Sequence, residues 1–318
     1  MALTSGSDNL STYMGNVHVL GSINMDLVAR VVRFPRPGET LMGSDFQLLP
    51  GGKGLNQAVA ARRSGAAVAM HGAVGEDPNG AALREFLDRE AIAVEGVRSI
   101  SGTATGTAMI LVDQDGENCI VVVPGANEHV THRRSDKGPG KGDVLVAPFE
   151  VPDAAIEPAF TEAQSRGAFT VLNPAPARVC RPEILDRVDL LVVNETELSF
   201  YAGETTELAL PENRVVELVG QLARRHGADI VATLGGKGLV ASLSGQISTY
   251  PARRVEVCDT TAAGDTFVGA MAARIADGEP VKTSLLFAID AAAICVSRSG
   301  AAPSIPTLAE VRAISAAK

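Results

Sequence analysis

The sequence predicts an α/β protein with a central, mostly parallel β-sheet covered by helices on both faces. Three observations predict this fold class. Short apolar runs alternate with helical stretches along most of the chain, as in strand–helix–strand units. The helical stretches space apolar residues at i, i+3, i+4 and i+7, as Val215, Leu218, Val219 and Leu222 do. Glycine-rich turns follow strand-like runs at their carboxyl ends, where open α/β sheets bind ligands.

We expect one main domain. The chain has 318 residues, and α/β folds of this size often form a single domain with an insertion. No internal repeat or low-complexity linker divides the sequence. The prediction is a flexible polar tail over residues 1–16, followed by a single α/β domain over residues 17–318 that carries a small β excursion.

The composition of the chain limits the kinds of partner that we expect. Hydrophobic residues make up 46% and charged residues 20% of the chain, as in soluble globular proteins. No apolar run approaches the roughly 18 residues of a membrane span. The tail contains no Lys or Arg and lacks the apolar block of a signal peptide. A cytoplasmic protein with no membrane partner is therefore expected.

Charge and cysteine usage exclude further classes. The formal net charge of −9, the absence of Trp and only 4% aromatic residues disfavour nucleic acid as a partner. The four cysteines lie far apart, without a C-x-x-C pair or a histidine at metal-ligand spacing. Zinc and a disulfide framework are not expected.

Periodicity and turn residues assign the elements in chain order. The first part is predicted to contain strands at 17–20 and 27–32, a turn at 34–40, an extended segment up to residue 49, a helix from the turn at 50–57 to residue 63, a strand at 67–73, a helix at 79–91 and a strand at 93–97. A hairpin is predicted from 107–112 and 118–123, because Asp115-Gly116 between them favours a tight turn. The remainder alternates strand 144–146, helix 154–166, strands 169–172 and 190–193, helix 215–225 and strand 230–233.

The most informative stretch is the turn from Asp259 to Phe267. Val255 to Cys258 is predicted to end a strand, and an apolar stripe beginning at Phe267 predicts a helix after it. The first N–H groups of a helix lack partners and its dipole is positive there, so backbone alone can hold a phosphate. The small residues at 262–264 leave room for one.

Asp265 adds a carboxylate beside this anion site. A carboxylate repels phosphate, so its presence makes sense if it takes a proton. Phosphoryl transfer needs a base for the acceptor hydroxyl and preorganised donors for the phosphoryl group, and this turn can supply both. The alternative is an ordinary capped helix start with Asp in the first turn.

Known nucleotide fingerprints are absent. Neither Gly52-Lys53-Gly54 nor Gly236-Lys237-Gly238 completes a P-loop, and no G-x-G-x-x-G follows the first strand. A glycine-rich loop does follow the strand at 230–233. Asn194 and Glu197 follow another strand, and they either cap a helix or position a metal-water shell near phosphates.

Two pairs of polar residues suit a polyol. Asn24 and Asp26 face the same way in extended backbone. Lys53 and Asn56 share a face near a helix start. The alternatives are a surface lysine and a capping asparagine.

Five motifs taken together resemble the ribokinase/PfkB family of carbohydrate kinases. The resemblance spans residues 17–306 in the family's order. The motifs are Gly21-Ser22-Ile23-Asn24-Met25-Asp26, Gly51-Gly52-Lys53-Gly54-Leu55-Asn56-Gln57-Ala58, Asn173-Pro174-Ala175-Pro176-Ala177, Asn194-Glu195-Thr196-Glu197 and the turn from Asp259 to Phe267. The resemblance implies transfer of the ATP γ-phosphoryl group to the 5-hydroxyl of ribose, with Mg²⁺.

The resemblance also implies residue roles. Asp265 matches the catalytic base, which also contacts the sugar, and Ala262, Ala263 and Gly264 match the anion hole. The sugar-binding positions matched are Asn24, Asp26, Gly52, Lys53, Asn56 and Glu150. The nucleotide-binding positions matched are Asn194, Thr233, Gly235, Gly238 and Gly264. Glu197 matches the magnesium region. A site for K⁺ or another monovalent cation is matched, several of its members by backbone, by Asp259, Thr261, Cys295, Arg298, Gly300 and Ser304.

The family further implies a discontinuous β lid at about residues 24–50 and 104–124, which often pairs with a second lid in a homodimer. Two departures from the family pattern stand out. Residues 132–142 have no helical periodicity where the family has a helix, and Ile289 and Asp290 are an unfamiliar pair where adenine contacts are expected.

Other functions remain open. The acceptor could be 2-deoxyribose, fructose or a keto-sugar acid. A nucleoside needs an apolar or aromatic lid, and Phe46 is the lone aromatic of the lid strands. A non-catalytic sugar sensor would have no use for Asp265 facing a phosphate.

Overall fold

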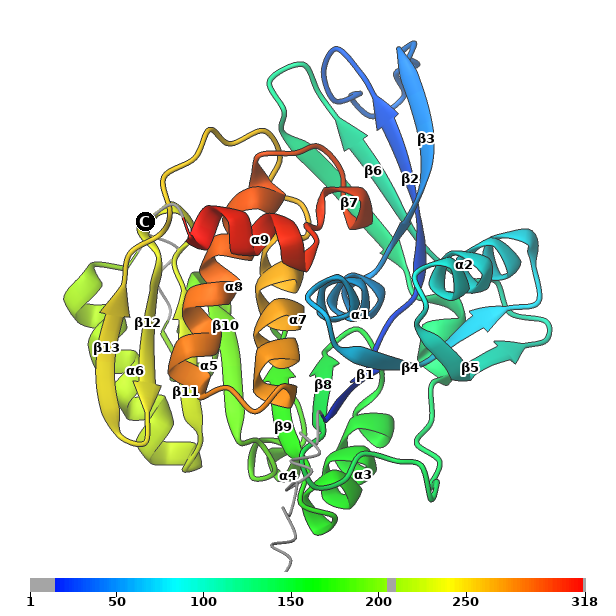
Figure 1. The fold of residues 1–318 in the computed structure, drawn as a ribbon. Coiled ribbons are helices and arrows are strands. Elements are labelled where there is room, and N and C mark those ends of the chain that lie inside the picture. Colours follow the sequence, from blue (N-terminus) through cyan, green and yellow to red (C-terminus); the bar gives the residue numbers. More distant parts are fainter. Residues whose placement is uncertain (1–14, 205–209, 317–318) are drawn as a thin grey trace, which may run out of the picture.

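The computed structural model describes residues 15–204 and 210–316 (Figure 1). Most of the predicted tail at 1–16 therefore lies outside the described residues, and Asn16 already begins the first strand. Within the described part of the chain, no helix is long and apolar enough to cross a membrane.

A nine-stranded sheet forms the centre of the molecule and confirms the predicted fold class. Seven neighbouring strands run parallel, and two antiparallel strands complete one edge. In spatial order, the strands are β13 (Gln246–Tyr250), β12 (Leu239–Leu243), β11 (Asp229–Thr233), β10 (Leu190–Asn194), β9 (Phe169–Asn173), β8 (Val144–Pro148), β1 (Asn16–Leu20), β4 (Ala67–Gly75) and β5 (Ala93–Ile100).

Helices cover both faces because the buried strands present apolar residues to both sides. In β1, Val17 and Val19 join one hydrophobic core and Leu20 joins the other. The first core is shared by α1 (Lys53–Arg63), α2 (Pro78–Arg89), α7 (Ala263–Ala276), α8 (Val281–Val296) and α9 (Leu308–Ser315). The second is shared by α3 (Asp153–Ser165), α4 (Pro182–Leu185), α5 (Glu195–Ala202) and α6 (Glu212–His226). Figure 1 shows α7, α8 and α9 in front of the strands and α6 behind them.

A second, four-stranded sheet projects from one end of the molecule (Figure 1). Its strands are, in spatial order, β3 (Asp45–Gly51), β2 (Asn24–Arg30), β6 (Gly106–Val112) and β7 (Asn118–Val123). The predicted hairpin of β6 and β7 is confirmed. β2 begins three residues earlier than predicted, because pairing with both β3 and β6 starts at Asn24. Asn24 and Asp26 therefore lie in a strand.

The predicted strand end at Val255 to Cys258 is wrong. The last strand of the main sheet, β13, ends at Tyr250, and residues 251–258 pair with no strand among the described residues. Val255 and Val257 alternate as strand residues do, but they are exposed. The physical reason is that β13 is the edge of the sheet, and the chain must leave this edge to reach α7.

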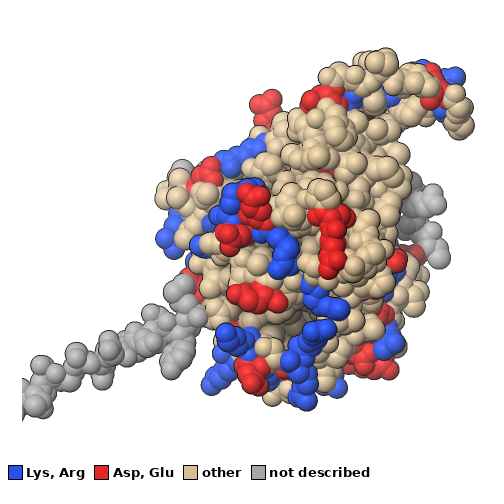
Figure 2. Space-filling model, turned by 90° about the vertical axis from the view of Figure 1, so that its right-hand side faces the viewer, with Lys and Arg blue, Asp and Glu red and all other residues tan. Residues whose placement is uncertain are grey.

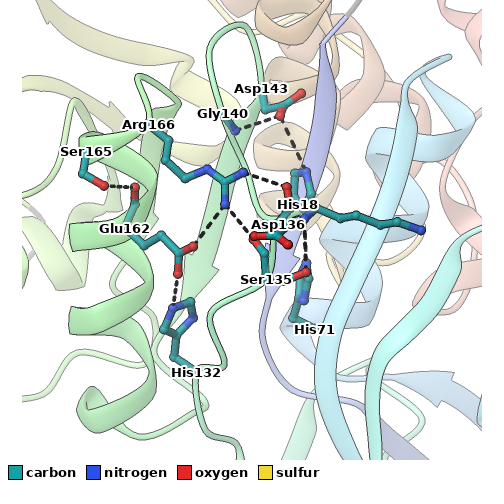
Figure 3. Close-up of polar contacts among 11 residues, drawn as sticks. His18, His71, His132, Ser135, Asp136, Gly140, Asp143, Glu162, Ser165 and Arg166 are labelled. Carbon is teal, nitrogen blue, oxygen red and sulfur yellow. Dashed lines mark hydrogen bonds and ion pairs between the residues drawn. The ribbon is translucent and has the colours of Figure 1, made fainter.

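The irregular segment at 132–142 is confirmed, and side chains of α3 and of Arg166, which caps the end of α3, hold it in place (Figure 3). Arg166 donates hydrogen bonds to the carbonyl oxygens of Ser135 and Asp136, at 2.6 and 2.8 Å. Glu162 lies 2.6 Å from the His132 ring. Ion pairing and hydrogen bonds therefore replace the apolar contacts of a helix here.

Beside this segment, His18 of β1 and His71 of β4 stack on each other (Figure 3). Their Nδ1 and Nε2 atoms lie 3.1 Å apart. Burial, together with the neighbouring His18 and His132, lowers the pKa of His71 to about 4 from 6.5.

This histidine pair should make the free energy of unfolding fall in acid. Because the folded pKa of His71 lies below the unfolded value, the unfolded chain binds the proton more tightly. The stability that the neutral His71 contributes is thus fully present above pH 6.5 and is lost as the pH falls toward 4. We expect this loss to be about 2–3 kcal/mol in unfolding free energy. His71→Gln, whose amide can replace Nε2, should shrink this loss in urea titrations at pH 4 and 7. His129→Gln, at an exposed site, is the control. An unchanged pH dependence in His71→Gln would contradict the assignment.

Candidate active site

Helix α7 begins with an open N-terminus. Ala262 precedes it in the left-handed conformation at φ 60°, and no described side chain caps this end. The alternative of an ordinary capped helix start is therefore wrong. A Cβ atom at Gly264 would meet no atom within 4 Å, so the space above the first turn is free. Unpaired amides and the helix dipole make this end suitable for an anion.

Asp265 lies in the same turn and is 6% exposed. Its Oδ2 accepts a hydrogen bond from Asn56 Nδ2 at 3.1 Å, and its Oδ1 accepts one from Gln57 Nε2 at 3.0 Å. Both donors lie on α1, which packs beside α7. Neutral donors thus hold a carboxylate beside a helix end that is suited to an anion.

Lys53 begins α1 and faces this carboxylate. Asp265 above all, with Glu150 and Glu197 adding to it, raises the pKa of Lys53 against the effect of burial. Lys53 is thus a cation inside the site, and the alternative of a plain surface lysine is wrong. Asn56 contacts Asp265 and does not cap α1, whose N-cap is Gly52.

Asp26 and Glu150 bring further carboxylates to the site. Glu150 follows β8, and its Oε2 accepts hydrogen bonds from Ser22 Oγ at 2.5 Å and from the Lys53 amide at 3.1 Å. Burial, and then the charges of Glu150 and Asp265, raise the pKa of Asp26 to about 7 from 3.8. A group of carboxylate and amide side chains therefore lies near the carboxyl ends of β1 and β8, which is the edge where open α/β sheets generally bind ligands.

Glycines allow this close packing. Gly52 has φ 89°, which favours glycine, and a Cβ atom at Gly51 would lie 2.0 Å from Asp26 Oδ2. A Cβ atom at Gly106 would lie 2.3 Å from Asn24 Oδ1. Side chains at these glycines would displace the carboxylate and the amide that line the site.

Sequence reasoning assigned no role to two buried amides in the site. Asn127 is 1% exposed; its Oδ1 accepts from the Ile23 amide, and its Nδ2 donates to Asn24 Oδ1 at 2.7 Å. Gln57 bridges Asp265 and Asn173. Gln57 and Asn173 stand inside quoted motifs, which was a usable signal. Asn127 lies more than a hundred residues from its partners, and the sequence offers no such signal for it.

A second group of residues lies along the sheet edge at β10 and β11. Asn194 and Thr233 occupy paired positions at the ends of these parallel strands. Asn194 and Glu197 form a capping box, so the capping alternative is confirmed. Burial raises the pKa of Glu197, although hydrogen bonds from Asn194 oppose this shift. Gly235 and Gly238 turn the next loop with φ 55° and 103°.

Asp259 organises a third group behind the α7 turn. Its Oδ1 accepts from the Thr261 amide at 2.8 Å and its Oδ2 from the Gly300 amide at 2.9 Å. Burial opposes ionisation, but these hydrogen bonds lower the pKa of Asp259. Cys295 Sγ lies 3.7 Å from the Thr261 carbonyl oxygen and 3.1 Å from Ser304 Oγ.

The side chains of Arg298 and Asp290 pair with charged residues at other places in the fold. The guanidinium of Arg298 pairs with Glu310 at 2.5 Å, so only its backbone remains for the third group. Asp290 is buried and pairs with Arg253 at 2.8 Å and with Ser315 Oγ at 2.6 Å. Asp290 thereby joins α8 to the end of α9.

Comparisons with known proteins agree with this geometry. The family model described as pfkB family carbohydrate kinase matches residues 14–308. The ribokinase of Haemophilus influenzae is 38% identical over 295 residues, which are 92% of this chain and 95% of the relative. The ribokinase of Schizosaccharomyces pombe is 38% identical over 308 residues, which are 94% and 97% of the two chains.

Solved structures agree as well. Arabidopsis thaliana ribokinase complexed with ribose and ATP has a TM-score of 0.84 and 30% identity, over 94% of this chain and 98% of that chain. The ribokinase of Thermotoga maritima has the same TM-score and identity, over 95% and 99%. The resemblance stated from the sequence is confirmed, and the chain belongs to the pfkB family of carbohydrate kinases.

Proposed function

We propose that this protein transfers the γ-phosphoryl group of ATP to the 5-hydroxyl of D-ribose, forming ribose 5-phosphate. One observation carries the proposal. The Asp265 carboxylate, held by Asn56 and Gln57, stands beside the uncapped N-terminus of α7. A base and an anion site in one turn are what transfer to an alcohol needs. The relatives named ribokinase support ribose as the acceptor.

In this reaction Asp265 takes the proton of the attacking hydroxyl. The backbone of residues 262–265, with Gly264 open to solvent, forms the anion hole that receives the charge of the transferring phosphoryl group. Lys53, a nearby cation, adds to this stabilisation. The proposed base and the proposed anion hole therefore both come from the first turn of α7, and Lys53 adds a positive charge from α1.

The sugar lies among the polar side chains at the ends of β1 and β8. Asn24, Asp26, Gly52, Lys53, Asn56 and Glu150 are its proposed ligands, and Asp265 contacts its 5-hydroxyl. Carboxylates and amides can recognise a polyol, because carboxylates accept hydrogen bonds from hydroxyls and amides both accept and donate them.

ATP lies along the edge formed by β10 and β11. Asn194, Thr233, Gly235 and Gly238 are its proposed contacts, with Gly264 next to its γ-phosphate. Mg²⁺ usually keeps several waters and binds through few carboxylates plus phosphates. Glu197 fits that pattern, because hydrogen bonds from Asn194 already occupy both its oxygens and leave contact through water. When bound, Mg²⁺ would screen the β- and γ-phosphates.

A monovalent cation, K⁺, is proposed behind the anion turn. Oxygen ligands suit this ion. The proposed ligands are the Asp259 carboxylate, Ser304 Oγ and the backbone carbonyl oxygens of Thr261, Cys295, Arg298 and Gly300. The low pKa of Asp259 keeps this carboxylate charged. Such an ion would hold the turn from 259 to 265 without touching ATP.

We further propose that residues 17–318 form one kinase domain with a β lid at about 24–50 and 104–124, and that two lids pair in a homodimer. Phe46, Leu48, Met109 and Val121 share one face of the small sheet by strand register, and they are exposed by 47–60%. The upper projection in Figure 2 is largely uncharged apart from its tip. An apolar sheet face of this kind favours association.

A cytoplasmic location is also proposed, because the reaction needs ATP.

The test is ADP release with ATP and Mg²⁺ across ribose, 2-deoxyribose, fructose and adenosine, with and without K⁺. We expect turnover with ribose that K⁺ increases and that a chelator of Mg²⁺ abolishes. Activity with another acceptor alone would overturn ribose as the substrate. Ribose binding by calorimetry without ADP release from any acceptor would favour a sugar sensor.

A further inference from the structure

Gln57 is buried at the junction of three elements. It lies on α1, is 0% exposed, and its Nε2 donates to Asp265 Oδ1 of α7 at 3.0 Å. The same Nε2 donates to Asn173 Oδ1, at the end of β9, at 3.1 Å. Gln57 therefore ties the carboxylate of α7 to the central sheet.

The orientation of this amide is determined by its neighbours. Asn173 Nδ2 donates to the Val192 carbonyl oxygen at 2.9 Å, so its oxygen must face Gln57. Both neighbours of the Gln57 nitrogen are acceptors. The Gln57 Oε1 atom makes no hydrogen bond within the described residues. A buried acceptor without a partner costs about 1–3 kcal/mol, so the site uses this side chain as a donor.

Close backbone approach makes the bridge rigid. Gly269 lies one turn after Asp265, and a Cβ atom there would lie 2.2 Å from the Gln57 carbonyl oxygen. The two helices therefore touch beside the bridge. The two oxygens of Asp265 also have separate donors, since Oδ1 faces Gln57 and Oδ2 faces Asn56. Donors on both oxygens define the rotation of the carboxylate about its last bond.

We propose that Gln57 is a positioning residue, which holds the Asp265 carboxylate at one rotation and one distance from α1 so that it meets the sugar hydroxyl. Gln57 does not touch the substrate. This inference rests on the proposed function, and it adds the hydrogen bonds from Gln57 to Asn173 and Asp265 as the support that positions the proposed base. A positioning residue should change the rate of the chemical step and leave substrate binding nearly intact.

The experiment replaces the donor by an apolar side chain of similar volume, Gln57→Met. We expect kcat for ribose to fall about 10- to 100-fold, because misplacing a catalytic group by ~1 Å can cost about 100-fold. The KM values for ribose and ATP should change less than about threefold. Gln221→Met is the matched control, because Gln221 donates to the Glu217 carboxylate on the outer helix α6. Parental kcat in Gln57→Met, or a rise in KM with kcat retained, would overturn the proposal.

A double-mutant cycle separates positioning from general damage. In an Asp265→Asn background, Gln57→Met should lower the single-turnover rate by less than about twofold, since the group that Gln57 orients is gone. A full additive loss would overturn the proposal.

The isosteric Gln57→Glu keeps the packing and places an acceptor against Asp265, so its kcat should fall at least as far as that of Gln57→Met. Kinase activity of the parent is measured first. Its absence would refute the proposed function, and an active parent with indifferent variants would refute only the role of Gln57. Unfolding of both variants would show that the amide holds the fold, which also overturns the proposal.

Discussion

Asp265→Asn should lower kcat for ribose phosphorylation by at least ~100-fold, the usual cost of losing a positioned base. An amide cannot accept the proton of the attacking hydroxyl at neutral pH. The anion turn does not depend on this side chain, since its donors are backbone amides at the start of α7. Binding of ATP and ribose should therefore persist, and the loss should appear in kcat. Single-turnover formation of ADP and calorimetric binding measure the two effects separately.

Stability must be followed in the same variant. Asn56 and Gln57 both offer donors to the carboxylate, and an asparagine at position 265 retains one acceptor for the two. We expect a lower melting temperature but a folded protein. Asp88→Asn, on the exposed side of α2, is the control and should match the parent in both respects. Near-parental turnover of a folded Asp265→Asn enzyme would remove the base from the proposed reaction.

Asp26→Asn should stabilise the free protein at alkaline pH while impairing ribose use. The pKa of Asp26 is raised to about 7 from 3.8, chiefly by burial. The folded state therefore binds the proton more tightly than the unfolded state. The stability that this group contributes is present below pH 4 and is lost as the pH rises through 7. The full loss at pH 8 is about 4 kcal/mol.

Asparagine does not titrate, so the variant escapes this loss. Its advantage over the parent in urea unfolding should be small at pH 4 and grow to about 4 kcal/mol at pH 8. Asp45→Asn, exposed at the start of β3, is the control and should show no such trend. The kcat/KM for ribose should fall at least about tenfold, because a buried polar partner of the sugar is lost. If the unfolding free energies of parent and variant depended equally on pH, ionisation of Asp26 would not destabilise the folded protein, and the prediction would be wrong.

Local periodicity was enough to predict the fold class and most elements. Alternating apolar and amphipathic stretches depend on neighbours within one or two turns, and these neighbours are visible in the sequence. The same applies to the α7 turn, since small residues and an aspartate before an apolar helix are a local signal. The strand predicted to end at Val255 to Cys258 has no such local basis. A strand exists only if a partner strand lies beside it, and β13 already closes the sheet edge.

The electrostatics of the site depended on the tertiary structure. The pKa of Asp26 is set by burial and by Glu150 and Asp265, which the sheet order brings close from distant parts of the chain. The buried amide of Asn127 meets Asn24 across 103 residues. By itself the sequence determined which residue types stand at the strand ends and helix starts, because short-range backbone preferences decide these elements. Only the packing of α1 against α7 decided which donors face Asp265, because hydrogen bonds between distant segments follow from the order of strands and helices in space.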